Sequence, residues 1–115
     1  MKKFRCPVCG FMGLAKKPYD SNLSGSGEIC QCCGFQFGYD DQSSQARKRI
    51  QESHDSYRIK WLFEGAKVFH PSSFPVEYIQ KNSTRMTETQ LIRQLNTIGF
   101  KHNVPNKKLM KTIMN

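Results

Sequence analysis

The sequence predicts a small α+β protein. We expect a zinc-ribbon-like module with two cysteine turns and short strands, followed by two or three helices packed on it. Two observations favour this fold class: matched cysteine pairs lie within the first 42 residues, and helical patterns of apolar residues follow them. At 115 residues the chain has the length of one domain or of a module with an extension. We divide it into the module with its packing helix over 1–70 and a helical C-terminal extension over 71–115.

The two cysteine pairs have the spacing of a structural zinc site. Cys6 with Cys9 and Cys30 with Cys33 each form a C-x2-C pair that is followed by glycine. We call residues 6–10 the first knuckle and residues 30–34 the second knuckle. Two intervening residues let both thiolates of a pair point at one ion, and four sulfurs complete the tetrahedral shell of structural zinc. We therefore predict one zinc ion with these four ligands. Iron in a rubredoxin-like electron-transfer site is the alternative.

A fifth cysteine, Cys32, lies inside the second knuckle, where the first knuckle has Val8. Its position predicts a small buried side chain outside the metal shell. The alternative is a spare thiol that exchanges with a ligand or senses oxidation.

The remaining elements of the module follow from composition and period. Residues 4–6 predict a short strand, and the Gly- and Ser-rich residues 16–27 predict a flexible connection between the knuckles. Phe35, Phe37 and Tyr39 alternate with other residues, which indicates a half-buried strand with an aromatic face. We assign that face to the core, and stacking on nucleic-acid bases is the alternative.

A long amphipathic helix is predicted over residues 44–63, with capping groups at 40–44 and Gly65 as its terminator. Residues 53–56 are a possible interruption with a fresh cap. The expected buried stripe consists of Ala46, Ile50, His54, Tyr57 and Trp61, widened by Ile59, Leu62, Phe63 and Ala66. Because four sulfurs are already available, we expect His54 to be a packed, hydrogen-bonded histidine.

A second helix is predicted from Thr87, where Thr87 and Gln90 have the spacing of a capping box. Leu91, Leu95 and Ile98 form its buried stripe, and Gly99 ends it. A short basic helix is expected after Pro105.

Charge and composition narrow the class of function. The formal net charge is +9, and the part beyond residue 42 contributes 13 of the 18 basic residues and 5 of the 9 acidic ones. The N-terminus lacks the apolar core of a secretion signal, and no apolar run is long enough to span a membrane. We therefore expect a cytoplasmic protein, where paired cysteines favour metal over disulfides.

A closed four-cysteine shell leaves no coordination position for a substrate, so we expect no enzymatic activity and no small-molecule substrate. The predicted function is a structural zinc site that presents a basic helical surface to a macromolecule, with a protein as the favoured partner. Nucleic-acid binding is the alternative. Its candidate residues on the first helix are Arg47, Lys48, Arg49, Arg58 and Lys60.

The motifs together resemble those of the cysteine-rich CPCC family of small bacterial proteins. The matching stretches are Cys6-Pro7-Val8-Cys9-Gly10, Glu28-Ile29-Cys30, Cys33-Gly34-Phe35 and Phe37-Gly38 with Asp40-Asp41. The later residues Tyr57-Arg58, Trp61, Gly65 and Phe69 resemble the helix that often follows, so the likeness covers residues 4–70. Gln31 stands where a proline is usual. The resemblance implies a zinc-ribbon-like metal module and brings no established activity with it.

Overall fold

The computed structural model describes residues 2–41 and 47–100. It contains, in chain order, β1 (Phe4–Arg5), β2 (Met12–Leu14), α1 (Arg47–Phe63), the 3-10 turns η1 (Pro71–Ser73) and η2 (Val76–Tyr78), and α2 (Glu88–Thr97). The two strands pair antiparallel, with Phe4 opposite Leu14 and Arg5 opposite Met12. The predicted class, a small α+β protein, is confirmed.

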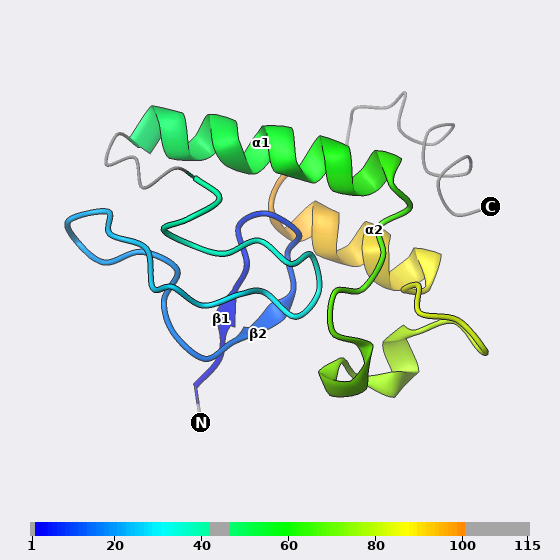
Figure 1. Ribbon diagram of the computed structural model, residues 1–115. Helices are drawn as coiled ribbons and strands as arrows, with labels where there is room; N and C mark the ends of the chain where they lie inside the picture. Colours follow the sequence, from blue (N-terminus) through cyan, green and yellow to red (C-terminus); the bar gives the residue numbers. More distant parts are fainter. Residues whose placement is uncertain (1, 42–46, 101–115) are drawn as a thin grey trace.

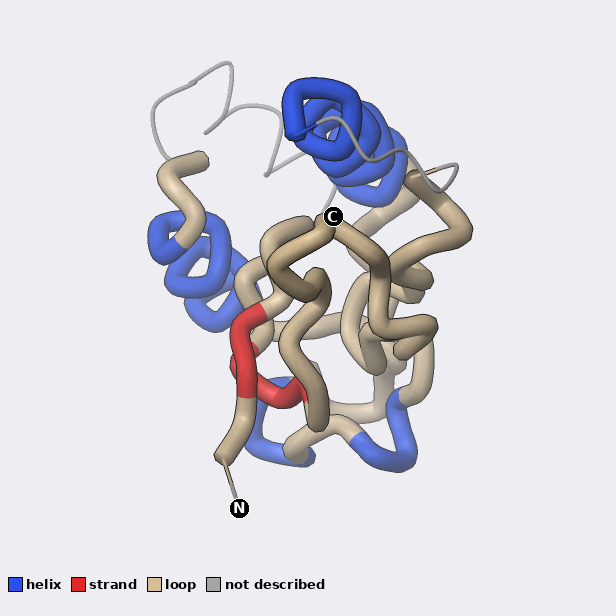
Figure 2. The backbone as a smooth tube through the Cα atoms, turned by 90° about the vertical axis from the view of Figure 1, so that its left-hand side faces the viewer, coloured by secondary structure: helices blue, strands red, loops and turns tan. Residues whose placement is uncertain are grey.

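The helices cover a layer of loops that carries the cysteines. α1 extends across the top of the molecule in Figure 1, and α2 lies lower. Figure 2 shows α1 nearly end-on above the loops and α2 along one side, next to the strands. None of the helices in the described ranges is both long and apolar enough to cross a membrane.

The predicted aromatic strand over residues 35–39 is wrong, because the segment forms no strand: Gln36 makes one isolated antiparallel bridge with Ile29, and the chain then turns from residue 37. Gly34 and Gly38, with φ of +82° and +96°, bend the chain on both sides of Phe35 and Phe37. The Asp40 carboxylate accepts from the backbone N–H of Gln36 at 2.7 Å and closes the turn. The assignment of the first two aromatic rings to the core is confirmed, since Phe35 and Phe37 are fully buried, whereas Tyr39 is 67% exposed.

α1 is one continuous helix, so the possible interruption at residues 53–56 does not occur. Ser53 instead donates its hydroxyl to the Arg49 carbonyl one turn earlier. Ile50, His54 and Trp61 are buried, as predicted. Ala46 and the predicted caps at 43 and 44 lie outside the described residues.

The predicted widening of the buried side of α1 is only partly correct. Leu62 and Ala66 are buried, whereas Ile59 and Phe63 are 47% and 65% exposed. Ile59 and Phe63 are four residues apart and share a stripe that turns away from Trp61 and the core. Gly65, with φ of +100°, ends the helix as expected.

α2 begins and ends as predicted. Thr87 is its N-cap, with a side-chain oxygen that accepts from the Gln90 N–H at 3.2 Å. Leu91 and Leu95 are buried, and Gly99 follows with φ of +81°. The basic helix predicted beyond Pro105 lies outside the described residues.

A single hydrophobic cluster joins these elements. It contains all five cysteines together with Trp61 of α1, Phe74 and Met86 of the connection, and Leu91 and Leu95 of α2. Residues from both sides of position 70 therefore pack on the cysteine module. The boundary at residue 70 stays a prediction.

Two glycines with the same backbone conformation offer a matched test of this packing. Gly10 has φ of +84° and Gly27 has φ of +82°. A Cβ at Gly10 would overlap the backbone carbonyl of Gln94 in α2, whereas nothing lies within 4 Å of a Cβ at Gly27. We expect Gly27→Ala to lower the free energy of unfolding by about 1 kcal/mol, the conformational cost alone. Gly10→Ala should lower it by at least about 3 kcal/mol, because α2 must also move. Equal losses in urea denaturation would contradict this packing of α2.

Candidate metal centre

The four cysteines of the two knuckles come together at one point. Their sulfur atoms all lie within 4.8 Å of one another, and all four side chains are buried. The Sγ atoms of Cys6 and Cys33 are 3.8 Å apart, and those of Cys9 and Cys30 are 3.7 Å apart. A zinc–sulfur bond of about 2.3 Å in a tetrahedron gives a sulfur–sulfur edge of about 3.8 Å. The cysteines are free thiols at distances that fit a tetrahedral metal ion.

The backbones of the two knuckles have the same conformation and form the same pattern of hydrogen bonds. In the first, the Cys6 N–H donates to the Phe11 carbonyl at 2.8 Å, and the Gly10 N–H donates to the Cys6 carbonyl at 2.8 Å. In the second, the corresponding bonds from Cys30 to Phe35 and from Gly34 to Cys30 are 3.0 and 2.9 Å long. The glycine of each knuckle has a positive φ, which glycine adopts without steric cost. The repeated C-x2-C-G pattern thus encodes two equivalent turns, each presenting two sulfurs.

Side chains from the helices bind the backbone of the first knuckle. The Arg58 guanidinium of α1 donates from Nε to the Val8 carbonyl at 2.6 Å and from Nη2 to the Pro7 carbonyl at 3.1 Å. The Gln94 amide of α2 donates to the Cys9 carbonyl at 3.2 Å. Three consecutive carbonyls of this turn therefore receive donors from two helices.

The second knuckle is held in the same way by different groups. The Tyr57 hydroxyl donates to the Cys33 carbonyl at 2.9 Å. The backbone N–H groups of Phe69 and His70 donate to the carbonyls of Cys32 and Gln31, both at 2.9 Å. Adjacent residues of α1 thus bind different knuckles, so the helix bridges the cluster.

This arrangement corrects one residue of the predicted basic surface. Arg47, Lys48, Arg49 and Lys60 are exposed, but Arg58 is only 5% exposed and its guanidinium is committed to the first knuckle. Position 58 lies one turn after His54 on the buried side of α1, which explains its burial. Arg58 is therefore not available for phosphate contacts.

Burial affects how readily the four thiols of the cluster ionise. Burial raises the pKa of the Cys6, Cys9 and Cys33 thiols, because a thiolate loses its hydration there. Hydrogen bonds from Cys33, Cys6 and Cys9 lower the pKa of Cys30. A divalent metal ion supplies the positive charge that lets all four sulfurs ionise together.

Cys32 is fully buried and lies outside the group of four. Its sulfur accepts from the Gln94 amide at 3.5 Å, so it helps to hold α2 against the second knuckle. The expected burial of a small side chain is confirmed. The redox alternative for Cys32 stays a prediction.

A buried polar network links α1 to the loop between the knuckles, and sequence reasoning missed it. The Tyr19 hydroxyl donates to Asp41, and the His54 Nε2 lies 2.9 Å from the same hydroxyl oxygen. Since the hydroxyl hydrogen is directed to Asp41, His54 Nε2 is the donor in the second bond. Asp41 also accepts from the Gly38 N–H at 3.0 Å. The expectation of a packed, hydrogen-bonded His54 is confirmed.

His54 predicts a pH dependence of stability. Burial, with a smaller contribution from the Arg58 charge, lowers the pKa of His54 from 6.5 to about 4. The unfolded chain therefore takes up a proton near pH 6.5, whereas the folded chain takes it up only near pH 4. Stability should be unaffected above this window and fall by at most about 3 kcal/mol as the pH drops through it.

Urea denaturation at several pH values, with metal in excess, measures this effect. His54→Asn is expected to remove this part of the slope, while the contribution of the metal ligands remains. The same slope in both proteins would show that His54 does not carry it.

The described chain is thus a small α+β protein built around a buried four-cysteine cluster with the geometry of a metal centre. Its sequence is similar to that of the uncharacterized protein YoaQ of Bacillus subtilis (strain 168), at 30% identity over 107 residues that cover 86% of this chain and 89% of YoaQ. The uncharacterized protein YozI of the same organism is 27% identical over 108 residues, covering 86% and 88%. The chain belongs to the family of YoaQ. No family model matches it. No solved structure matches it significantly.

Proposed function

We propose that this protein is a non-enzymatic zinc-binding protein in which the metal is structural. The observation that carries the proposal is the set of four buried thiols at tetrahedral spacing. A catalytic zinc keeps one position for water or substrate, whereas four cysteine ligands close the shell. A closed shell also argues against a small-molecule substrate.

Five buried free thiols suit the reducing cytoplasm, which is the compartment we propose.

The module around the metal is, in this proposal, zinc-ribbon-like and of the CPCC type. The equivalent backbone bonds of the two knuckles and their positive-φ glycines support this assignment. Gln31, at the usual proline position, keeps its carbonyl bound to the His70 N–H, so the departure does not disturb the turn.

The proposed partner is another protein, bound at the outer face of α1. Lys48, Ile59 and Phe63 recur there at helical spacing, and all are exposed. Ile59 and Phe63 are one turn apart, with Lys48 three turns earlier on the same face. An exposed aromatic ring with an apolar neighbour is typical of protein interfaces, whereas a phosphate-binding surface needs several free cations. The burial of Arg58 removes one of the five residues on which the nucleic-acid alternative depends.

The metal assignment predicts which cysteines are required. Cys30→Ser should abolish stoichiometric metal, because the shell loses a thiolate, whereas Cys32→Ser should retain one ion. Elemental analysis of the purified proteins measures both the content and the identity of the metal. Loss of the metal in Cys32→Ser and its retention in Cys30→Ser would overturn the assignment. A red protein that contains iron would favour rubredoxin-like electron transfer.

A further inference from the structure

The two equivalent knuckles are covered by very different parts of the molecule. Gly10 of the first knuckle lies directly against the backbone of α2, where a Cβ would overlap the Gln94 carbonyl. Gly34 of the second knuckle lies against the side chain of Phe69, whose ring would be 2.7 Å from a Cβ. Phe69 is 57% exposed. A rotation of the Phe69 side chain can therefore expose the second knuckle at Gly34 while its backbone hydrogen bonds stay in place, whereas exposing Gly10 of the first knuckle requires a helix to move.

A surface hollow of about 250 Å³ lies beside the second knuckle, and Cys33 is among the residues that line it. It is bordered by Cys33, Tyr57, Trp61, Val68, Phe69, Glu64 and the cations Lys60 and Lys67. Cys33 is 3% exposed, whereas Cys6, Cys9 and Cys30 are completely buried. Of the four ligands, Cys33 is thus the one at the edge of the core.

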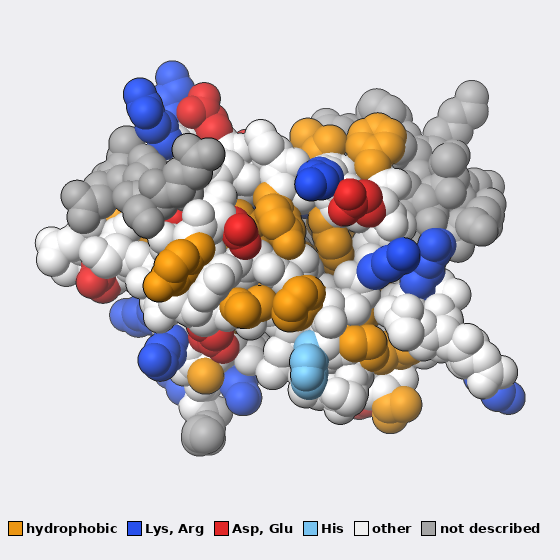
Figure 3. All heavy atoms as spheres, in the orientation of Figure 1, with side chains coloured by type: hydrophobic (Ala, Val, Ile, Leu, Met, Phe, Trp, Pro, Cys, Tyr) orange, Lys and Arg blue, Asp and Glu red, His pale blue; other side chains and the backbone are white. Residues whose placement is uncertain are grey.

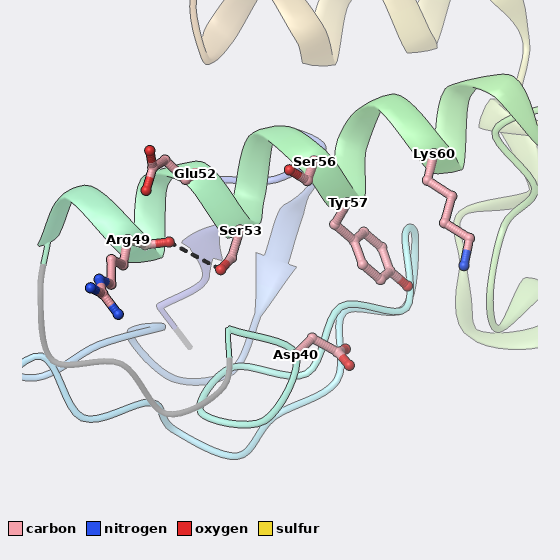
Figure 4. A pocket seen from close by; sticks show the side chains of 7 residues that line it. All are labelled: Asp40, Arg49, Glu52, Ser53, Ser56, Tyr57 and Lys60. Carbon is pink, nitrogen blue, oxygen red and sulfur yellow. Dashed lines mark hydrogen bonds between the residues drawn. The ribbon is translucent and has the colours of Figure 1, made fainter.

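The hollow opens on the face below α1. Figure 3 shows hydrophobic side chains gathered on this face, with charged side chains among them. A neighbouring hollow of about 670 Å³ shares Tyr57 and Lys60 with the first, and Figure 4 shows both side chains pointing from α1 toward the turns beneath it. The exposed cations Lys60 and Lys67 therefore lie at the border of the hollow that Cys33 and Phe69 line.

We propose that the metal enters and leaves the centre through this hollow, with Cys33 as the first ligand to exchange and Phe69 as the gate. This inference rests on the proposed metal centre. The incoming ligand is an anionic metal carrier, a thiolate or carboxylate, which Lys60 and Lys67 attract electrostatically. It forms a bond to the metal as the bond to the Cys33 sulfur breaks. The released thiolate takes a proton from water, and the oxidation state of the metal does not change.

Transfer of zinc to the coloured chelator 4-(2-pyridylazo)resorcinol, followed by stopped-flow absorbance, tests the gate. Phe69→Ala should accelerate the transfer about tenfold, a factor equivalent to about 1.4 kcal/mol in the barrier. Phe63→Ala is the matched control, since Phe63 is 65% exposed on α1 and does not border the hollow. It should leave the rate unchanged. Equal rates for Phe69→Ala and the parent protein, or equal acceleration by both variants, would overturn the proposal. Phe69→Leu provides the same comparison if the alanine variant does not fold.

Chemical modification tests the order of exchange. Limited reaction of the zinc-loaded protein with N-ethylmaleimide, followed by peptide mass spectrometry, should label Cys33 before Cys6, Cys9 and Cys30. First labelling of any of those three would overturn the proposal. A chain that binds no zinc would instead refute the proposed function, so the two failures are distinguishable.

Discussion

Removal of the metal with a chelator is expected to unfold the core and to shift the fluorescence of Trp61 to the red. Residues 2–41 contain only two short strands, so the knuckles have little regular secondary structure of their own, and the contacts from the helices depend on the knuckles keeping their shape around the metal. A structural zinc site contributes on the order of 10 kcal/mol, which is comparable to the whole stability of a domain. Trp61 is the single tryptophan and is 6% exposed. Its indole N–H donates to the Lys67 carbonyl at 2.9 Å, so its emission reports on the contact between α1 and the following loop.

Two controls make this experiment specific to the four-cysteine cluster. Adding zinc back under reducing conditions should restore the original emission, which separates metal loss from irreversible oxidation. Cys32→Ser should respond as the parent protein does. An unchanged spectrum after elemental analysis has shown complete metal removal would demonstrate that the fold does not depend on the metal.

Replacement of Arg58 is expected to have the second largest effect. Arg58→Ala leaves the carbonyls of Pro7 and Val8 without their guanidinium donor and removes the link between α1 and the first knuckle. It also removes the contact with the Phe100 ring, whose centroid lies 5.5 Å from the guanidinium carbon. Unpaired buried polar groups cost about 1–3 kcal/mol each, so we expect a loss of about 3–5 kcal/mol in the free energy of unfolding.

Urea denaturation followed by Trp61 fluorescence measures this loss. Arg49→Ala, in the same helix but exposed, should change stability by no more than about 0.5 kcal/mol. Arg58→Lys should be intermediate, because one ammonium group cannot match the fork that reaches two carbonyls. Equal stabilities for Arg58→Ala and Arg49→Ala would contradict the bridging role of Arg58.

Features that depend on local sequence were predictable. The C-x2-C-G spacing encodes each knuckle, and its repetition indicated the same four cysteines whose sulfurs the structure brings together. The helical spacing of apolar residues predicted α1 and α2, because this spacing is a property of the segment itself and does not require knowledge of its distant partners. Gly65 and Gly99 ended the helices as expected, since the positive φ that follows a helix is also a local property.

Features that depend on distant partners were not predictable. From the sequence alone, Arg58 resembles an exposed charged residue. Its burial depends on the carbonyl of Val8, fifty residues away, which accepts a hydrogen bond from the guanidinium. The burial of Asp41 likewise follows from Tyr19 and His54, which come from two other segments. The aromatic alternation at 35–39 favoured a strand, but the positive φ of Gly34 and Gly38 turns the chain instead. The periodicity of a segment shows which of its side chains are apolar, but it does not show which other element of the fold packs on them.

The absorption spectrum of the cobalt-substituted protein tests the central claim most directly. Cobalt(II) takes the place of zinc in tetrahedral sites, and its visible spectrum reports both the geometry and the ligands. A centre formed by Cys6, Cys9, Cys30 and Cys33 predicts intense tetrahedral bands and a near-ultraviolet sulfur-to-cobalt charge-transfer band, both reaching saturation at one equivalent. Weak octahedral bands without charge transfer would contradict the four-cysteine metal centre.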